Sequence, residues 1–158
     1  MSFNHRYVWS TAFVKELLRK ECVPEAVTFG YFLAIMIFDW LQFTLIATTP
    51  TPRINVWSEA SSWITFVVTV LGLLYLYRKN GGGNGKQFLQ RYFPLSVTVG
   101  WKFVAAMFIS LWLVSAGLAG RDEETVGWST TVTLALINIA MFWRIGFHLS
   151  SLSDEAAV

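Results

Sequence analysis

The chain has 158 residues and a formal net charge of +2, and 54% of its residues are hydrophobic whereas only 14% are charged. A soluble domain of this length has too little interior to bury so many apolar side chains. The composition therefore excludes an ordinary water-soluble fold, and the chain is too short to add a separate soluble domain to several membrane spans. We expect one compact helical membrane unit with no nucleic-acid partner.

The first predicted element is an amphipathic helix within residues 1–25, a segment that we place in the cytoplasm. Ser10 or Thr11 can cap the stretch TAFVKELLRKECV. Its apolar face would carry Phe13, Val14, Leu17, Leu18 and Cys22, and its polar face Lys15, Glu16, Arg19 and Lys20. We expect this helix to lie along the inner leaflet. Cys22 is the single cysteine, so it has no partner for an internal disulfide, and we interpret it as an inert thiol rather than a lipidation site.

Four apolar blocks come next, and each is long enough to cross the roughly 30 Å hydrocarbon layer of a bilayer as a helix. The blocks cover residues 26–49, 60–77, 95–119 and 126–147. They are apolar all round, whereas the strands of a membrane β-barrel would alternate apolar and polar residues. We predict an all-α, integral membrane four-helix bundle over residues 26–149, followed by a short polar cytoplasmic tail over residues 150–158.

The connection between the second and third blocks contains NGGGNGKQ, residues 80–87, which looks at first like a phosphate-binding loop. Such a loop requires G-x-x-x-x-G-K-[ST], but Asn80 takes the place of the first glycine and Gln87 that of the hydroxyl residue. The stretch also follows a predicted membrane helix, whereas a phosphate-binding loop follows a β-strand. We therefore expect a flexible cytoplasmic turn and no bound nucleotide.

The next stretch, KQFLQRYFP, predicts a second short interfacial helix. Phe88, Leu89, Tyr92 and Phe93 would lie near one another, and Pro94 would end the helix before the third block because the residue ahead of a proline disfavours helical geometry. The two amphipathic segments could dock a cytoplasmic partner or anionic lipid, or they could only anchor the bundle. We favour the anchoring role.

Basic residues determine the predicted orientation, because short loops rich in Lys and Arg stay in the cytoplasm. Of the 12 Lys and Arg residues, only Arg53 and Arg121 fall on the predicted outer side. We therefore expect both termini in the cytoplasm, in a plasma membrane or a bacterial inner membrane. The predicted anchors at the inner interface are Arg19, Lys20, Arg78, Lys79, Lys86, Arg91, Lys102 and Arg144.

Three polar residues form a candidate cluster within the apolar blocks. Asp39 lies near the centre of the first block, where a carboxylate costs about 2.5 to 3.5 kcal/mol and has to be paired, protonated or hydrated. Gln42 shares its helical face, and Asn138 has a similar depth in the fourth block. Asp39 could bond to Asn138 or to another copy of the chain, or it could carry protons. We favour the structural role because a proton path normally holds more than one intramembrane acid.

Small residues at helical spacing predict close contacts between helices. One stripe in the second block consists of Ser61, Thr65, Thr69 and Gly72, and shorter pairs consist of Gly30 with Ala34 and Ala106 with Ser110. These residues suit contacts inside the bundle or between copies of the chain, and the sequence does not separate the two uses.

Catalytic motifs are not found in the sequence. Its two histidines lie far apart, which excludes an H-E-x-x-H motif and a three-histidine zinc site, and no G-x-S-x-G is present. The acidic run at Asp122, Glu123 and Glu124 is interpreted as a solvated turn rather than a calcium site. We expect no enzyme activity, no catalytic residue, no cofactor and no metal.

The sequence thus favours a small multi-spanning membrane protein with a non-enzymatic accessory, regulatory or assembly role. It would act through helix–helix contacts and through its cytoplasmic face, in the lipid bilayer, as a homo-oligomer or as part of a larger membrane complex. The alternative is a small oligomeric ion channel or proton-coupled transporter that uses Asp39 with Gln42 and Asn138.

Overall fold

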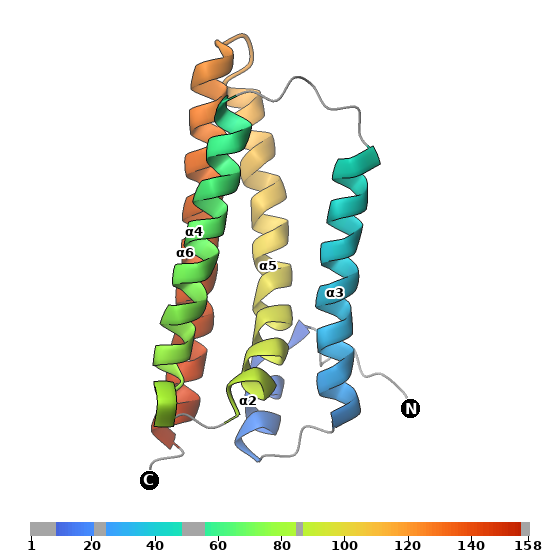
Figure 1. Ribbon diagram of the computed structural model, residues 1–158, viewed down its shortest axis with the longest axis vertical. Coiled ribbons are helices and arrows are strands. Elements are labelled where there is room, and N and C mark those ends of the chain that lie inside the picture. The colour runs from blue at the N-terminus through green and yellow to red at the C-terminus, as the bar shows by residue number, and fades with distance from the viewer. Residues whose placement is uncertain (1–8, 21–24, 49–55, 85–86, 156–158) are drawn as a thin grey trace.

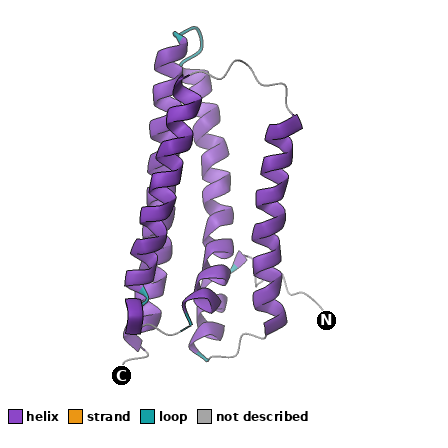
Figure 2. Ribbon diagram, viewed as in Figure 1, coloured by secondary structure: helices purple, strands orange, loops and turns teal. Residues whose placement is uncertain are grey.

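The computed structural model describes residues 9–20, 25–48, 56–84 and 87–155, and helices are the only regular elements in these ranges (Figures 1 and 2). The α-helices are α2 (Thr11–Arg19), α3 (Glu25–Thr48), α4 (Val56–Lys79), α5 (Phe88–Gly117) and α6 (Glu123–Glu155), and a short 3-10 helix, η1 (Gly82–Asn84), follows α4. The all-helical class predicted from the sequence is confirmed. Lys86, one of the predicted basic anchors, lies outside the described residues.

The helices pack unequally. α4 and α6 run in the same direction, side by side, and α5 runs antiparallel to them against α6 (Figure 1). α3 packs chiefly against α5, and α2 contacts α5 and α6 near the end of the molecule where the α4–α5 turn lies. The closed four-helix bundle therefore stays a prediction, because the structure shows a continuous α4, α5 and α6 core with α3 beside it.

The hydrophobic core includes residues of the short helix α2 as well as the long helices. Val14 is 1% exposed and Leu18 is 6% exposed, and both pack with Leu95, Ile145 and Leu149 of α5 and α6. The apolar face of α2 that we expected to rest on the inner leaflet is thus used, at these two residues, to cover the protein core. The remaining buried members of this core are Leu76, Val99, Phe142 and Leu152.

The start of α2 follows the sequence prediction. The backbone N–H of Phe13 donates a hydrogen bond of 3.3 Å to the side-chain hydroxyl of Ser10, which is the N-cap residue. A side-chain oxygen at this position satisfies one of the backbone donors that a helix leaves unpaired at its beginning. Ser10, one of the two predicted candidates, therefore caps α2.

The structure corrects the predicted break at Pro94. α5 is one helix from Phe88 to Gly117, and Pro94 lies inside it and is buried, so no separate interfacial helix precedes this span. Proline removes a single backbone hydrogen bond, to the carbonyl of Gln90. Nearby hydroxyl groups add side-chain bonds, since Thr98 donates to the Pro94 carbonyl at 2.9 Å and Ser96 donates to the Phe93 carbonyl at 3.0 Å.

The turns at the helix ends rely on glycine and on a capping aspartate. After α4 ends at Lys79, Gly81 and Gly82 adopt φ values of 97° and 57°, which are left-handed conformations that glycine adopts without steric cost. The turn predicted for the glycine-rich stretch is therefore present in its described part. At the opposite end of the molecule, Asp122 accepts a hydrogen bond of 2.8 Å from the Thr125 N–H and caps α6.

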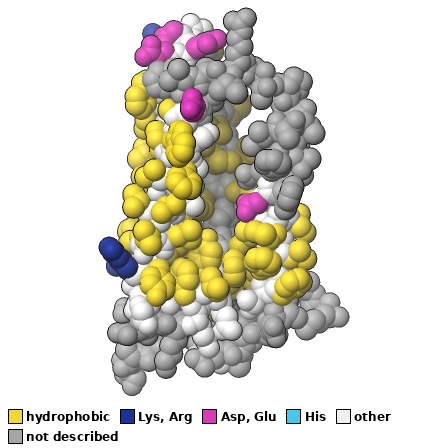
Figure 3. All heavy atoms as spheres, viewed as in Figure 1, with side chains coloured by type: hydrophobic (Ala, Val, Ile, Leu, Met, Phe, Trp, Pro, Cys, Tyr) yellow, Lys and Arg dark blue, Asp and Glu magenta, His cyan; other side chains and the backbone are white. Residues whose placement is uncertain are grey.

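Among the residues that the structure describes, three helices are long and apolar enough to cross a membrane: Glu59–Lys79 in α4, Phe88–Gly117 in α5 and Glu123–Leu152 in α6. In the described part of α3, Val27–Asp39 forms a shorter apolar stretch. Large hydrophobic side chains point outward along these helices, including Phe108 at 65% exposed and Trp112 at 69% exposed. In Figure 3, hydrophobic side chains cover the middle of the molecule, while several carboxylates gather at its upper end. Such a band is what a surface in contact with lipid requires.

Candidate functional site

The tightest helix contact lies between α4 and α6 and consists of two reciprocal pairs of a glycine and an aromatic ring. A Cβ atom added at Gly72 would lie 2.5 Å from the Phe142 ring, so the ring occupies the space that a larger residue would need. On the facing helix, a Cβ added at Gly146 would overlap the ring of Tyr75. Each helix thus places one glycine under one aromatic ring of its neighbour, which allows the two backbones to approach closely.

Gly72 is a residue that the sequence assigned to helix packing, and the structure places it in a contact within the chain. Gly146 was not assigned, although Gly146 and Ser150, four residues later, have the small-xxx-small spacing. A glycine one turn after a buried aromatic residue on the same helix is the signal that could have identified it. The contact partner of each glycine depends on the neighbouring helix, so spacing within one helix does not reveal it.

The other small residues are less enclosed. A Cβ added at Gly30 of α3 would meet nothing within 4 Å, and its partner Ala34 is exposed. Ala106 of α5 and Thr65 of α4 are exposed as well, whereas Ser61, Thr69 and Ser110 are half-buried. Ala34 lines the cavity between α3, α5 and α6, whereas the space at Gly30 is open, so a neighbouring backbone could approach α3 at Gly30.

The candidate polar cluster is not joined in the structure. The Asn138 side-chain amide donates a hydrogen bond of 3.0 Å to the Leu134 carbonyl of its own helix, α6. Asp39 is exposed on α3, and in the part of the chain that the structure describes it forms no hydrogen bond or salt bridge. The side chain of Gln42 lies outside the described residues. The Asp39–Asn138 bond that the sequence suggested is therefore not seen, because α3 packs against α5 rather than against α6.

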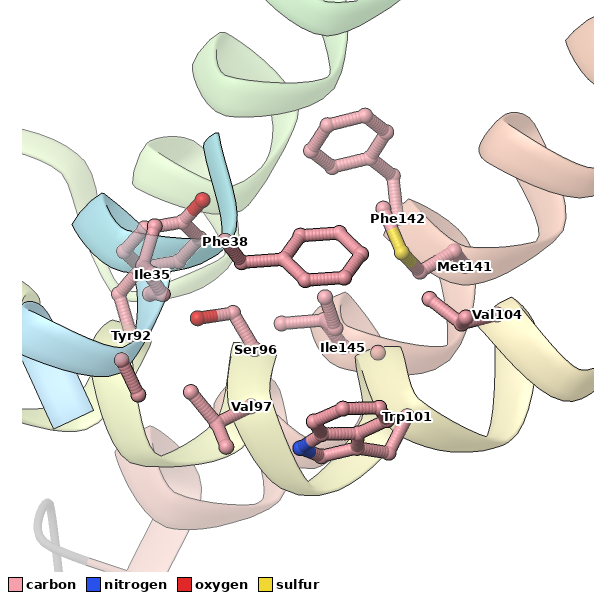
Figure 4. A pocket seen from close by; sticks show the side chains of 12 residues that line it. Ile35, Phe38, Tyr92, Ser96, Val97, Trp101, Val104, Met141, Phe142 and Ile145 are labelled. Atoms are coloured by element: carbon pink, nitrogen blue, oxygen red, sulfur yellow. The ribbon is translucent and has the colours of Figure 1, made fainter. Parts of the chain in front are cut away.

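A cavity of about 240 Å³ lies where α3, α5 and α6 come together, and nearly all of its lining is apolar. Figure 4 shows Ile35 and Phe38 of α3 facing Trp101 of α5 and Phe142 of α6 across this space. The rings of Phe38 and Trp101 meet edge-on with centroids 6.0 Å apart. Ser96 also lines the cavity, but its hydroxyl already donates to the Phe93 carbonyl. The cavity therefore offers shape and apolar surface rather than chemistry.

Basic side chains gather at the end of the molecule that carries α2 and the α4–α5 turn. Glu16 forms salt bridges with Lys20 at 2.9 Å and with Arg19 at 3.9 Å on the surface of α2, and the hydrogen bond from Lys20 lowers the pKa of the Glu16 carboxyl below its usual value. Lys79 lies over the Tyr75 ring at 5.9 Å from its centroid, and Arg78 is exposed. These exposed pairs orient the side chains but contribute little to stability.

Arg91 differs from the other predicted anchors because it is buried. It is 6% exposed, and its Nε atom has no hydrogen-bond partner. The reason lies in the register of α5: Arg91 comes one turn before Leu95 and two turns before Thr98, which are both fully buried. The sequence predicted Arg91 on a separate interfacial helix, but α5 is continuous and Arg91 is buried on it.

No group of three or more His, Cys, Asp or Glu side chains that could hold a metal ion occurs among the residues with described positions. Comparison with protein-family models, with curated proteins and with solved structures yields no match to this chain. The fold therefore defines only the class: an all-helical protein whose three long apolar helices are compatible with residence in a membrane.

Proposed function

We propose that this chain is a four-span membrane protein with a non-enzymatic accessory, regulatory or assembly role, and that it works by associating with a second copy of itself or within a larger membrane complex. Its working surfaces would be the small-residue helix faces and the cytoplasmic face. No nucleic acid or nucleotide is involved in this proposal.

The orientation in this proposal places both termini in the cytoplasm of a plasma membrane or a bacterial inner membrane. The distribution of charge supports it. The acidic run Asp122 to Glu124 lies at the α5–α6 turn, whereas α2 and the α4–α5 turn, with their basic residues, lie at the opposite end (Figure 1). Lys and Arg near short loops favour the cytoplasmic side.

The open face of α3 is the observation that carries the association. Gly30 has free space where a side chain could stand, Ala34 is exposed beside it, and α3 touches the rest of the chain chiefly through α5. In a membrane, helices associate through close backbone packing at small residues rather than through a hydrophobic driving force. A helix with such a face and few internal contacts is suited to a partner helix.

The test is purification of the full chain in mild detergent, followed by measurement of the mass of the protein complex. We expect a defined assembly that Gly30→Leu disrupts, because the leucine fills the space that a partner backbone would occupy. The matched control is Gly117→Leu, since a Cβ at Gly117 also meets nothing within 4 Å but lies at the end of α5. A monodisperse monomer without a partner, or equal assembly by wild type and both variants, would contradict the proposal.

A second candidate, a small oligomeric channel or proton-coupled transporter, is favoured by one observation. Asp39 presents an exposed carboxylate without a salt bridge among the described residues, directly after Phe38, which lines the cavity. An ionisable residue within an apolar helix is a candidate for ion or proton transfer, and Gln42 and Asn138 would assist it. Flux across proteoliposomes that disappears in Asp39→Asn would support this candidate, and absence of flux in the wild-type protein would exclude it.

A further inference from the structure

Four basic side chains from three helices converge beside α2, and we call them the basic cluster: Lys15 of α2, Lys102 of α5, and Arg144 and His148 of α6. The Lys102 ammonium group donates a hydrogen bond of 3.2 Å to the Thr11 hydroxyl, which ties α5 to the first residue of α2. Lys15 lies one turn after Thr11 on α2, Arg144 lies one turn before His148 on α6, and α2 packs against both α5 and α6. The cluster is therefore produced by the tertiary fold, since its members are far apart in the chain.

The basic cluster has no carboxylate to balance it among the described groups. None of its four members forms a salt bridge with a carboxylate in the part of the chain that the structure describes. Glu16, which belongs to the neighbouring turn of α2, is already bound to Lys20 and Arg19. Cations held close together repel one another, and an anion placed between them reduces that repulsion.

His148 adds an unused polar atom to this cluster. Its Nδ1 atom is buried and has no hydrogen-bond partner, although buried polar atoms in folded proteins are nearly always paired. An oxygen atom of a bound anion can accept hydrogen bonds from the neighbouring ammonium and guanidinium groups. A phosphate group offers several such oxygen atoms at once.

The surroundings of the basic cluster indicate where this phosphate comes from. Trp101, Trp143 and Phe147 are the direct neighbours in sequence of Lys102, Arg144 and His148, and they are 45%, 62% and 54% exposed. The Arg144 guanidinium lies 5.6 Å from the centre of the Phe147 ring. Tryptophan and cationic side chains together mark the headgroup level of a bilayer, where basic sites between helices bind anionic lipid.

We infer that the basic cluster binds the phosphate group of an anionic phospholipid in the leaflet on the α2 side of the membrane. This inference rests on the proposed function only in taking the chain to be embedded in a bilayer. It gives the cytoplasmic face a defined ligand, and it explains why α2 is held against α5 and α6 near the predicted membrane surface. Bound lipid would bridge all three helices at this point.

The test uses the full chain in detergent micelles that contain phosphatidylcholine and phosphatidylglycerol in equal amounts, with native mass spectrometry to count retained lipid. We expect the wild-type protein to retain phosphatidylglycerol selectively. Lys102→Gln and Arg144→Gln should each reduce that retention by about fivefold, which corresponds to about 1 kcal/mol for each basic residue near the surface. Lys102→Arg should retain lipid like the wild type, since it keeps the charge.

Lys79→Gln is the matched control, because Lys79 lies at the same end of the molecule but over the Tyr75 ring and outside the basic cluster. It should retain lipid like the wild type. Equal retention of both lipids, or an equal loss in Lys79→Gln and Lys102→Gln, would overturn the inference. Stabilisation of the protein by inorganic phosphate to the same extent as by phosphatidylglycerol would also overturn it, because the ligand would then be a soluble anion. The assembly measurement with Gly30→Leu is independent of these outcomes, so the failure of one proposal is distinguishable from that of the other.

Discussion

Replacement of Gly72 by alanine should destabilise the protein, even though alanine is the better helix former. In the interior of an exposed helix, Gly→Ala contributes about 1 kcal/mol of added stability. At Gly72, however, the new methyl group would lie 2.5 Å from both Cγ and Cδ2 of Phe142. Separations this short are strongly repulsive, so either the ring or the helix has to move.

The position of Phe142 decides the sign of the effect. The Phe142 side chain is 6% exposed and belongs to the core. The Cγ atom attaches the ring to Cβ, so Cγ moves away from the new methyl group only if χ1 or the backbone changes. Overpacking of a filled core costs about 1 to 3 kcal/mol. After subtraction of the gain in helix propensity, we expect Gly72→Ala to lower the free energy of unfolding by up to about 2 kcal/mol.

Reversible unfolding in mixed micelles with increasing denaturing detergent would measure this change. Gly100→Ala is the matched control, because Gly100 lies inside α5 and a Cβ added there meets nothing within 4 Å. It should be neutral or more stable than the wild type. In a Phe142→Ala background no Cγ remains at position 142, so Gly72→Ala should cost less there than in the wild-type protein. If Gly72→Ala were as stable as Gly100→Ala, the close packing of α4 against α6 would be refuted.

Three further predictions concern the core and the helix caps. Leu149 has no exposed surface, and Leu149→Ala should lower the free energy of unfolding by about 2 to 5 kcal/mol. Phe147 is 54% exposed, so Phe147→Ala should change the free energy of unfolding far less in the same assay. Ser10→Ala removes the N-cap of α2 and should cost about 1 kcal/mol, seen as faster hydrogen exchange of the α2 amides without a change in α6. Hydrogen bonds from the N–H and hydroxyl of Thr125 lower the pKa of the Asp122 carboxyl in the folded protein. The stability that this carboxylate contributes is therefore complete above its unfolded-state pKa and is lost as the pH falls through the lower folded-state pKa. Thermal unfolding measured from neutral to acidic pH should therefore show a smaller acid-induced decrease in Asp122→Asn than in the wild type, and an identical decrease would contradict this role of the carboxylate.

The hydrophobic pattern was sufficient to predict most of the helical architecture. Blocks that are apolar over more than about 18 residues have to satisfy their backbone hydrogen bonds internally, and the α-helix does so within one segment. The end of α4 at Lys79 follows from Gly81 and Gly82, which adopt left-handed conformations, and the start of α2 follows from the hydroxyl of Ser10. These features depend on neighbouring residues only, so the sequence contains the information they need.

Pro94 shows why one local rule failed. A proline disfavours helical geometry in the residue before it, and this preference predicted a break. The preference is modest compared with the gain from burying Leu95, Val99 and Pro94 itself on a continuous helix. That gain depends on the α6 surface that covers these residues, and α6 begins well after the proline in the chain. The burial of Arg91 follows from the same continuity.

The sequence by itself determined which segments are helical, where several of them begin and end, and which end of the molecule is rich in basic residues, because these properties depend on composition and on local hydrogen bonds. The tertiary structure alone decided that α2 covers the core through Val14 and Leu18, that Gly146 receives the ring of Tyr75, and that Asp39 and Asn138 do not bond. The physical reason is that helical periodicity defines the composition of each face but not the element that packs against it. The choice among partners depends on the shapes of two surfaces at once, as the reciprocal glycine and aromatic pairs between α4 and α6 demonstrate.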